Sequence, residues 1–493
     1  MAGGHLRRVA ARLGLTLASL ALTLASLELA ARLLTPSFLV QEREGVFASL
    51  LPLVNGRSAE IQVLQLGPPL PVAAEAGELR VATFGESSME GAPWGHAASP
   101  ATQLGGLLAG ALPGRRVTVL NLGRTSSFAL DTWYYLVGTA RYRPDVVVFY
   151  LGMNDRYDLD REACLPATHP TLHGAWRWMV ERSRLLWLTR VYLPRLAGGP
   201  GSGADVTGSE REQPLRCDPD RAFQAWTDVL VETATRHGAR VVVATPVFSC
   251  LAPLDRDFAG AHRGVAPGEA LASADGPYRR ALACLLAAGC DLGAVDLGPD
   301  GLGGLVEAGL RVVAAAASPA LVKPPDELRG AAWKRSAAAF GATLVDFAAA
   351  LRAISPGHRL GPPHLVDSVH LSPTAYGLLA RQVARAILDG QRSGPGAATG
   401  PVASLPDGAG EPVLAVQDPT EVALTYARAR QFLTAAILAG QPAAAANPRA
   451  RLLLGWLRRG LGGPSGLDAA DEAGLEDFAA GAGLVRGAAS PAR

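Results

Sequence analysis

The sequence has little of what nucleic-acid-binding and zinc-binding proteins need. Its 493 residues carry a formal net charge of +2, and lysine occurs only at Lys323 and Lys334. A nearly neutral chain lacks the basic surface that a nucleic-acid partner requires. None of the five cysteines forms a Cys-x-x-Cys pair, and the nearby histidines lack zinc-finger spacing. The sequence therefore argues against a nucleic-acid partner and against a structural zinc site.

The cysteines leave two interpretations open. Because five is an odd number, at least one thiol is unpaired within the chain. Cys164 and Cys217 flank one insertion, so a disulfide between them is expected in an oxidising compartment. Buried free thiols are the alternative. No convincing repeat period runs along the chain.

The first 35 residues read as a membrane segment. A basic start ends at Arg12, and residues 13–34 are almost wholly apolar apart from small polar residues, Glu28 and Arg32. That length is just enough to span a bilayer. No small-x-small cleavage site precedes Thr35-Pro36, which favours an uncleaved anchor over a removed signal peptide or a buried soluble helix. Positive charge before the span predicts a cytoplasmic N-terminus and an extracytoplasmic remainder.

From residue 79 onward, apolar runs alternate with helical patterns. The run 146–151 is apolar throughout, as in strands of a parallel sheet that is covered on both faces. Ser372 and Pro373 suit the start of a final helix, and Gly390 suits its end. The predicted strands are 81–84, 117–122, 146–151, 241–244 and 343–347, and the predicted helices are 101–112, 128–142, 220–236, 327–340 and 373–388.

The remaining segments surround this trunk, which we place at 79–390. Residues 36–78 are predicted to form a juxtamembrane connector with a short strand or two. Two insertions, about 156–218 and 250–325, interrupt the trunk after its third and fourth strands. A Gly- and Pro-rich linker, 391–418, leads to a tail, 419–493, with predicted helices at 421–439 and 449–457.

Four short blocks fall at the ends of trunk elements. They are Gly85-Glu86-Ser87-Ser88 after the first strand, Asn121-Leu122-Gly123-Arg124 at the end of the second, Gly152-Met153-Asn154-Asp155 after the third, and Asp367-Ser368-Val369-His370 before the final helix. Each block alone reads as a turn or a helix cap. Together they meet at the carboxyl edge of one sheet, where open α/β proteins place their chemistry.

The side chains in these blocks suit serine catalysis. A serine hydroxyl is a poor nucleophile without a base. His370 can supply that base, because histidine side chains ordinarily have a pKa near neutrality. Asp367, three residues earlier, can orient the imidazole and stabilise its cation. An oxyanion could be bound by three hydrogen-bond donors: the backbone N–H groups of Ser87 and Gly123, and the side-chain amide of Asn154.

These blocks resemble those of the SGNH hydrolases, also called the GDSL esterase family, over about residues 79–390. The resemblance implies a three-layer α/β/α sandwich of the SGNH or flavodoxin-like type, with a parallel sheet of about five strands. It also implies a serine acyl-enzyme without metal or cofactor. The nucleophile by this pattern is Ser87 and not Ser88. The usual Gly-Asp-Ser reads Gly85-Glu86-Ser87 here, and Glu86 is not expected to take part in the chemistry.

The anchor and helical tail are similar to bacterial membrane-bound members of that family, some of which modify envelope polysaccharides. The sequence thus predicts a membrane-anchored, extracytoplasmic serine esterase acting on small-molecule or glycan esters, O-acetyl esters among them. An O-acyltransferase with the same triad is the first alternative, and a non-catalytic envelope scaffold is the second. The acyl group, the alcohol and the oligomeric state are not set by the sequence.

Overall fold

The computed structural model describes residues 2–34, 40–43, 46–49, 70–125, 127–154, 161–196, 217–248, 262, 265–274, 276–286, 325–355, 364–365, 369–393, 419–428, 431–440, 444 and 447–484. Predictions for Asp155, for Asp367, for most of the connector and second insertion, and for most of the linker lie outside these residues.

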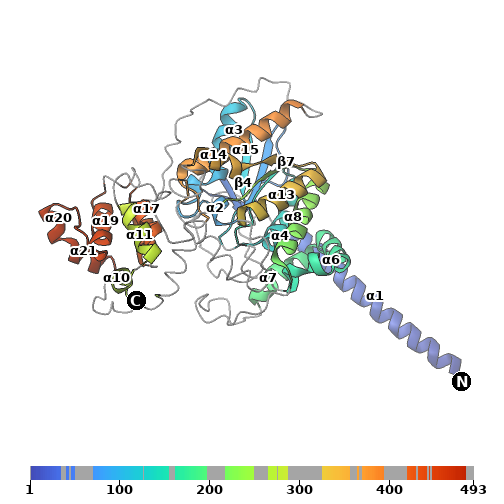
Figure 1. Ribbon diagram of the computed structural model, residues 1–493. Helices are drawn as coiled ribbons and strands as arrows, with labels where there is room; N and C mark the ends of the chain where they lie inside the picture. The colour runs from blue at the N-terminus through green and yellow to red at the C-terminus, as the bar shows by residue number, and fades with distance from the viewer. Residues whose placement is uncertain are drawn as a thin grey trace.

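A seven-stranded sheet forms the centre of the fold (Figure 1). Its order is β1-β2-β4-β3-β5-β6-β7, and the five strands from β4 to β7 are mutually parallel. This confirms the predicted parallel sheet of about five strands. The bounds are β1 (Val40–Arg43), β2 (Val46–Ser49), β3 (Leu79–Gly85), β4 (Val117–Asn121), β5 (Val146–Tyr150), β6 (Arg240–Ala244) and β7 (Thr343–Val345).

The β1–β2 hairpin comes from the predicted connector and extends the sheet. Its two strands are antiparallel, and β2 pairs in parallel with β4 through Phe47 and Ala48. If the five parallel strands, β3 to β7, are numbered 1 to 5 along the chain, their order across the sheet is 2-1-3-4-5. That order reverses direction between β3 and its two neighbours, β4 and β5, which is where doubly wound folds place ligands.

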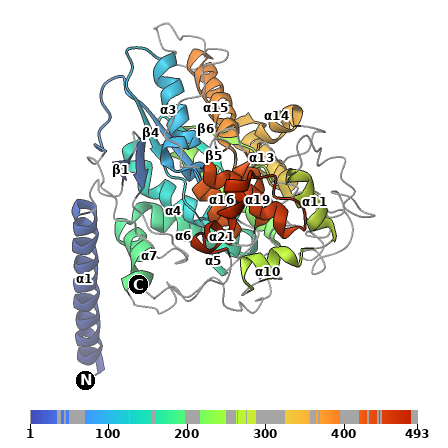
Figure 2. The ribbon, with the colours of Figure 1, turned by 90° about the vertical axis from the view of Figure 1, so that its left-hand side faces the viewer.

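Helices cover both faces of the sheet, so the fold has three layers (Figure 2). Successive strand residues point to opposite faces: Val146 and Val148 enter one hydrophobic core, and Val147 and Phe149 enter the other. The first core holds α3 (Pro100–Ala111), α14 (Phe347–Ile354) and α15 (Pro373–Ser393); the second holds α4 (Ala129–Thr139), α8 (Pro219–Arg236) and α13 (Pro325–Phe340). This alternation explains why the strands are apolar on both sides.

The last trunk helix begins as predicted but ends later. Ser372 Oγ accepts from Ala375 N at 3.3 Å, and Pro373 is the first helical residue. Gly390 does not end the helix, which continues to Ser393. A Cβ at Gly390 would collide with the guanidinium of Arg240, whose Nη2 donates to Ile387 O at 2.6 Å. The glycine therefore gives the arginine room and is no stop signal.

The first insertion contributes three helices: α5 (Arg161–Thr168), α6 (Pro170–Arg182) and α7 (Arg184–Leu196). A disulfide joins Cys164 of α5 to Cys217, which precedes α8. Trp187 of α7 is buried, and its Nε1 donates to Tyr134 O at 2.9 Å. These helices therefore pack on the α4 side of the sandwich.

A second helical unit combines the second insertion with the tail. Phe432 N donates to Tyr278 Oη at 3.0 Å, and Arg458 donates to Leu286 O. The predicted tail helix 421–439 is two helices, α16 and α17. The bundle consists of α10 (Pro267–Ala272), α11 (Gly276–Leu286), α16 (Pro419–Arg428), α17 (Phe432–Ala439), α19 (Pro448–Gly460), α20 (Ala469–Ala473) and α21 (Leu475–Gly481).

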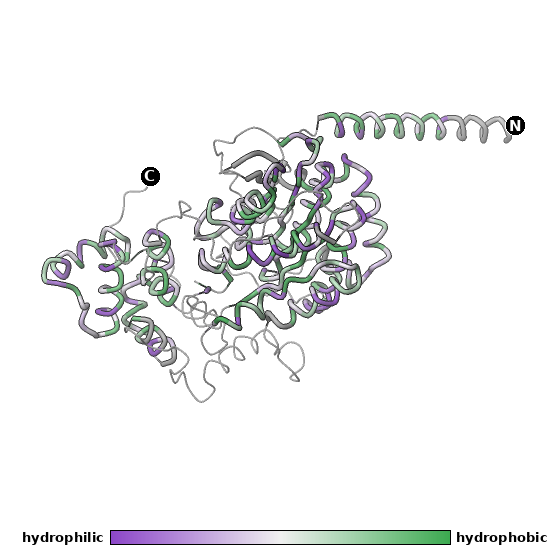
Figure 3. Tube along the Cα trace, turned by 90° about the horizontal axis from the view of Figure 1, so that it is seen from above, coloured by the Kyte–Doolittle hydropathy of each residue, from purple (hydrophilic) through white to green (hydrophobic). Residues whose placement is uncertain are grey.

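The N-terminal helix α1 (Ala2–Leu34) projects away from the rest of the fold in Figures 1 and 2. Its stretch Arg12–Leu33 is long and apolar enough to cross a membrane, a test that a signal sequence also passes. Figure 3 shows hydrophobic residues recurring along it.

Candidate active site

Ser87 lies where β3 gives way to the short helix α2 (Ser87–Glu90). Glu86 is the N-cap residue in extended conformation, and Gly91 closes the turn with φ 109°, a value that favours glycine. Ser87 is 7 % exposed. Because β3 pairs with both β4 and β5, this turn lies at the point where the strand order reverses.

The structure brings His370 to Ser87 across 283 residues of sequence. Their side chains meet with His370 Nε2 and Ser87 Oγ 2.7 Å apart. His370 directly precedes Leu371, which forms an isolated β-bridge with Leu365 just before α15. A neutral imidazole that carries its proton on Nδ1 accepts the serine hydroxyl proton through this contact. The nearby His364 accepts a hydrogen bond through its carbonyl from Ser372 N at 2.8 Å.

Two buried side chains hold the backbone on either side of His370. Ser88 Oγ donates to Val369 O at 2.8 Å, and Trp94 Nε1 donates to Leu371 O at 2.9 Å. Ser88 is thus committed to the histidine loop, and the hydroxyl beside the imidazole belongs to Ser87. Trp94 is 1 % exposed and therefore packs in the core.

Glu86 organises the turn that carries Asn154. Its side chain is fully buried, and its carboxylate accepts three backbone hydrogen bonds. The donors are Gly152 N at 3.1 Å, Met153 N at 3.0 Å and Asn154 N at 3.0 Å. Burial and then the charge of Glu86 raise the pKa of Tyr150 above its ordinary range. Glu86 therefore links the turn that carries Ser87 to the turn that carries Asn154 (the asparagine turn, residues 152–154). The sequence did not indicate this role.

The amide of Asn154 lies at the same edge. Its Nδ2 donates to Ser127 O at 3.0 Å, which fixes the side chain. An NH₂ group has two hydrogens, so one stays available for an oxyanion. The N–H of Gly123 donates to Asn121 Oδ1 at 3.0 Å, so its use as an oxyanion donor requires that bond to be shared.

Gly123 also has a packing role. A Cβ at this position would overlap the backbone of Met89 and Glu90, the last two residues of α2. The backbone just after β4 therefore approaches α2 more closely than any side chain at position 123 would allow.

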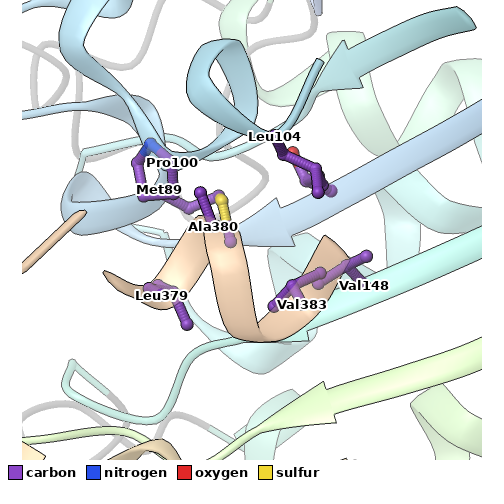
Figure 4. Close-up of a pocket in the computed structure, with 8 residues that line it drawn as sticks. Met89, Pro100, Leu104, Val148, Leu379, Ala380 and Val383 are labelled. Carbon is purple, nitrogen blue, oxygen red and sulfur yellow. The ribbon is translucent and has the colours of Figure 1, made fainter. Parts of the chain in front are cut away.

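Met89 belongs to the hydrophobic core below the site. It lines a small cavity with Pro100, Leu104, Val148 and the α15 residues Leu379, Ala380 and Val383 (Figure 4). The polar lining residue, Thr83, donates its hydroxyl to Leu120 O at 3.2 Å. The cavity is a gap in the apolar core and presents no polar group to a substrate. Among the described residues no group of three or more His, Cys, Asp or Glu side chains is placed to hold a metal ion.

Comparisons with known proteins return GDSL-type hydrolases among solved structures. No family model matches the sequence, and no curated protein matches it. A GDSL-like lipase from Bacteroides thetaiotaomicron is 10 % identical, covers 65 % of this chain and 92 % of its own, and has a TM-score of 0.32. The lipase/acylhydrolase from Enterococcus faecalis is 14 % identical over 63 % and 95 %, with a TM-score of 0.32. An acetyl xylan esterase from Geobacillus stearothermophilus is 16 % identical over 63 % and 94 %, with a TM-score of 0.30.

Proposed function

We propose that the protein is a serine ester hydrolase with Ser87 as its nucleophile. The observation that carries this proposal is the 2.7 Å contact between Ser87 Oγ and His370 Nε2 at the carboxyl edge of the parallel sheet. A nucleophile within hydrogen-bond reach of a base is the signature of covalent catalysis. A separation of these two groups too large for a hydrogen bond would have favoured the scaffold alternative.

The proposed reaction proceeds in two halves. His370 Nε2 takes the hydroxyl proton while Ser87 Oγ attacks the ester carbonyl, and the carbonyl oxygen becomes an oxyanion. Collapse of this intermediate breaks the ester C–O bond, and His370 returns the proton to the departing alcohol. Water then repeats the sequence on the acyl-serine and releases the acid. Asp367 is assigned to orient the imidazole.

The oxyanion donors in this scheme are the N–H of Ser87, the N–H of Gly123 and the free amide hydrogen of Asn154. Removal of one such donor costs roughly 3–4 kcal/mol of barrier in serine hydrolases. The amide of Asn154 is held from two sides, by Ser127 O and by the backbone bond to Glu86. It is therefore pre-organised for the transition state.

Turnover of p-nitrophenyl acetate by the full chain in detergent tests the proposal. We expect Ser87→Ala and His370→Ala each to lower kcat by at least about 10³-fold, because nucleophile and base act as a unit. Ser88→Ala is the matched serine control and should lose about tenfold, through the loosened His370 loop. His237→Ala, at the C-cap of α8, should keep full activity. Unchanged turnover in Ser87→Ala refutes the assignment.

The same assay separates hydrolysis from acyl transfer. When a sugar acceptor is added, a hydrolase releases acid at an unchanged rate, whereas an O-acyltransferase directs the acyl group to the sugar hydroxyl. We assign hydrolysis as the reaction, with small-molecule or glycan esters, O-acetyl esters among them, as the substrate class.

We further propose that α1 anchors the enzyme in a membrane with the catalytic domain outside the cytoplasm. The apolar stretch Arg12–Leu33 supports the anchor. The Cys164–Cys217 disulfide supports an oxidising compartment. Protease digestion of intact and permeabilised cells tests the orientation, because an extracytoplasmic domain is cleaved in cells whose cytoplasmic membrane is intact.

A further inference from the structure

Helix α6 of the first insertion exposes an apolar face. Leu172, Trp178 and Met179 are 60 %, 58 % and 41 % exposed. At 100° per residue, they share one side of the helix with the exposed Ala175 and Arg182, while His173 and Val180 are buried on the other side. Outside α1, the other strongly exposed large hydrophobic residues in the described chain are scattered singly. The exposed side of α6 carries no acidic residue.

The end of this helix is bonded to α1. The Glu28 carboxylate accepts from Ser183 Oγ at 2.8 Å, Arg184 N at 2.8 Å and Leu185 N at 2.9 Å. Arg32 donates to Glu28 at 2.7 Å and to Arg182 O at 2.7 Å. Figures 1 and 2 both place α6 and α7 beside the C-terminal part of α1. Glu28 therefore caps the first turn of α7 from within the apolar helix.

This contact fixes the depth of α6 relative to the proposed span. Glu28 lies five residues before Leu33, the end of the apolar stretch, which is about 7.5 Å at 1.5 Å per residue. Amphipathic helices at membrane surfaces bury their apolar face about 5–10 Å into the boundary between headgroups and acyl chains. The corner between α6 and α7 thus lies at the depth that such helices occupy.

The polar groups at this corner are suited to that depth. Glu28 and Arg32 would be costly in hydrocarbon if they were unpaired, but here they bond to each other and to the α6–α7 backbone. The Arg182 guanidinium lies 4.7 Å from the Trp178 ring centroid. Tryptophan is enriched at membrane interfaces, and arginine extends from an apolar surface toward phosphate groups.

We propose that the apolar face of α6, defined by Leu172, Trp178 and Met179, is seated in the outer leaflet of the membrane that α1 crosses. The inference rests on the proposed membrane anchor. Its consequence is that the catalytic domain is held in one orientation on the membrane surface, because α1 and α6 attach it at two points. A bilayer is favoured over a second copy as the occupant because Glu28 and Arg32, near the end of the apolar stretch of α1, bond to the end of α6 that carries this face.

Tryptophan quenching in the full chain tests this placement. The protein is reconstituted into phosphatidylethanolamine–phosphatidylglycerol vesicles whose acyl chains carry bromine either near the headgroup or near the chain end. We expect headgroup-proximal bromine to lower emission more than chain-end bromine, and Trp178→Phe to remove that loss. Trp176→Phe is the matched control on the same helix: Trp176 is half-buried, its Nε1 donates to Tyr134 Oη at 3.3 Å, and this variant should retain the quenching.

Three outcomes overturn the inference in distinguishable ways. Release of the wild type from vesicles by alkaline carbonate refutes the membrane anchor itself, and this result does not depend on the esterase activity. Retention in the vesicles with equal quenching of the wild type and Trp178→Phe refutes the α6 placement alone. A detergent-solubilised dimer that Trp178→Asp converts to a monomer, without lipid quenching, assigns the face to a second copy.

Discussion

Replacement of Glu86 by glutamine changes one atom of a buried carboxylate that holds the asparagine turn. One carboxylate oxygen, Oε1, accepts from Gly152 N and Asn154 N, and the other, Oε2, accepts from Met153 N. In the glutamine variant one of these oxygens becomes an NH₂ group, which cannot accept. If the amide oxygen keeps the Oε1 position, Met153 N–H faces another donor.

The magnitude follows from these three bonds. Hydrogen bonds to charged groups contribute roughly 1.5–3 kcal/mol each. Glu86→Gln loses one of them and weakens two, so we expect a loss of about 2–4 kcal/mol of folding free energy. Glu86→Ala leaves three N–H groups without this acceptor, two of them buried, and the loss should be larger. The asparagine turn then shifts, and loss of the Asn154 donor lowers kcat by about 10²- to 10³-fold.

Two measurements on the same variants separate positioning from plain stability. Thermal midpoints and kcat with p-nitrophenyl acetate should both fall in Glu86→Gln, whereas KM changes little because the ground state makes no use of the oxyanion site. Glu75→Gln is the matched control, because Glu75 is an exposed partner of Arg116, and such pairs contribute about 0–1 kcal/mol. A lower midpoint with unchanged kcat refutes the positioning role, and no change in either quantity refutes the whole argument.

Two further predictions concern α6 and the strand end after β4. Burial, and then the charge of Arg177, lower the pKa of His173 from 6.5 to about 4. The unfolded chain therefore binds the proton more tightly than the folded protein does. As the pH drops from 6.5 to 4, the free energy of unfolding should fall by about 3 kcal/mol. His173→Leu should remove this part of the acid sensitivity in unfolding measurements at several pH values, and an unchanged pH profile contradicts the prediction. Gly123→Ala places a methyl group against the Met89–Glu90 backbone; overpacking of this kind costs about 1–3 kcal/mol and should displace α2, so kcat should fall at least tenfold. Full activity in Gly123→Ala would show that the close approach is not required.

The parallel sheet could be predicted from the sequence because its signal is local. A strand buried on both faces is apolar at every position, and 146–151 shows this without reference to any partner. The topology then brings the four blocks together, since parallel strands end at one edge of a sheet. Ser87 and His370 were predicted on these grounds, and the structure places them 2.7 Å apart. The position of Asp367 lies outside the described residues and stays a prediction.

The tertiary structure alone decided which side chains support the site. Glu86 meets donors 66 to 68 residues later, and Ser88 meets a carbonyl 281 residues later. Residue patterns report burial and backbone conformation, but they do not report which distant group a buried polar side chain meets. The bond from Glu28 to the α6–α7 corner has the same origin. The sequence by itself therefore determined the parallel sheet and the edge at which Ser87 and His370 meet, while long-range packing decided how that edge is held and how α1 joins it.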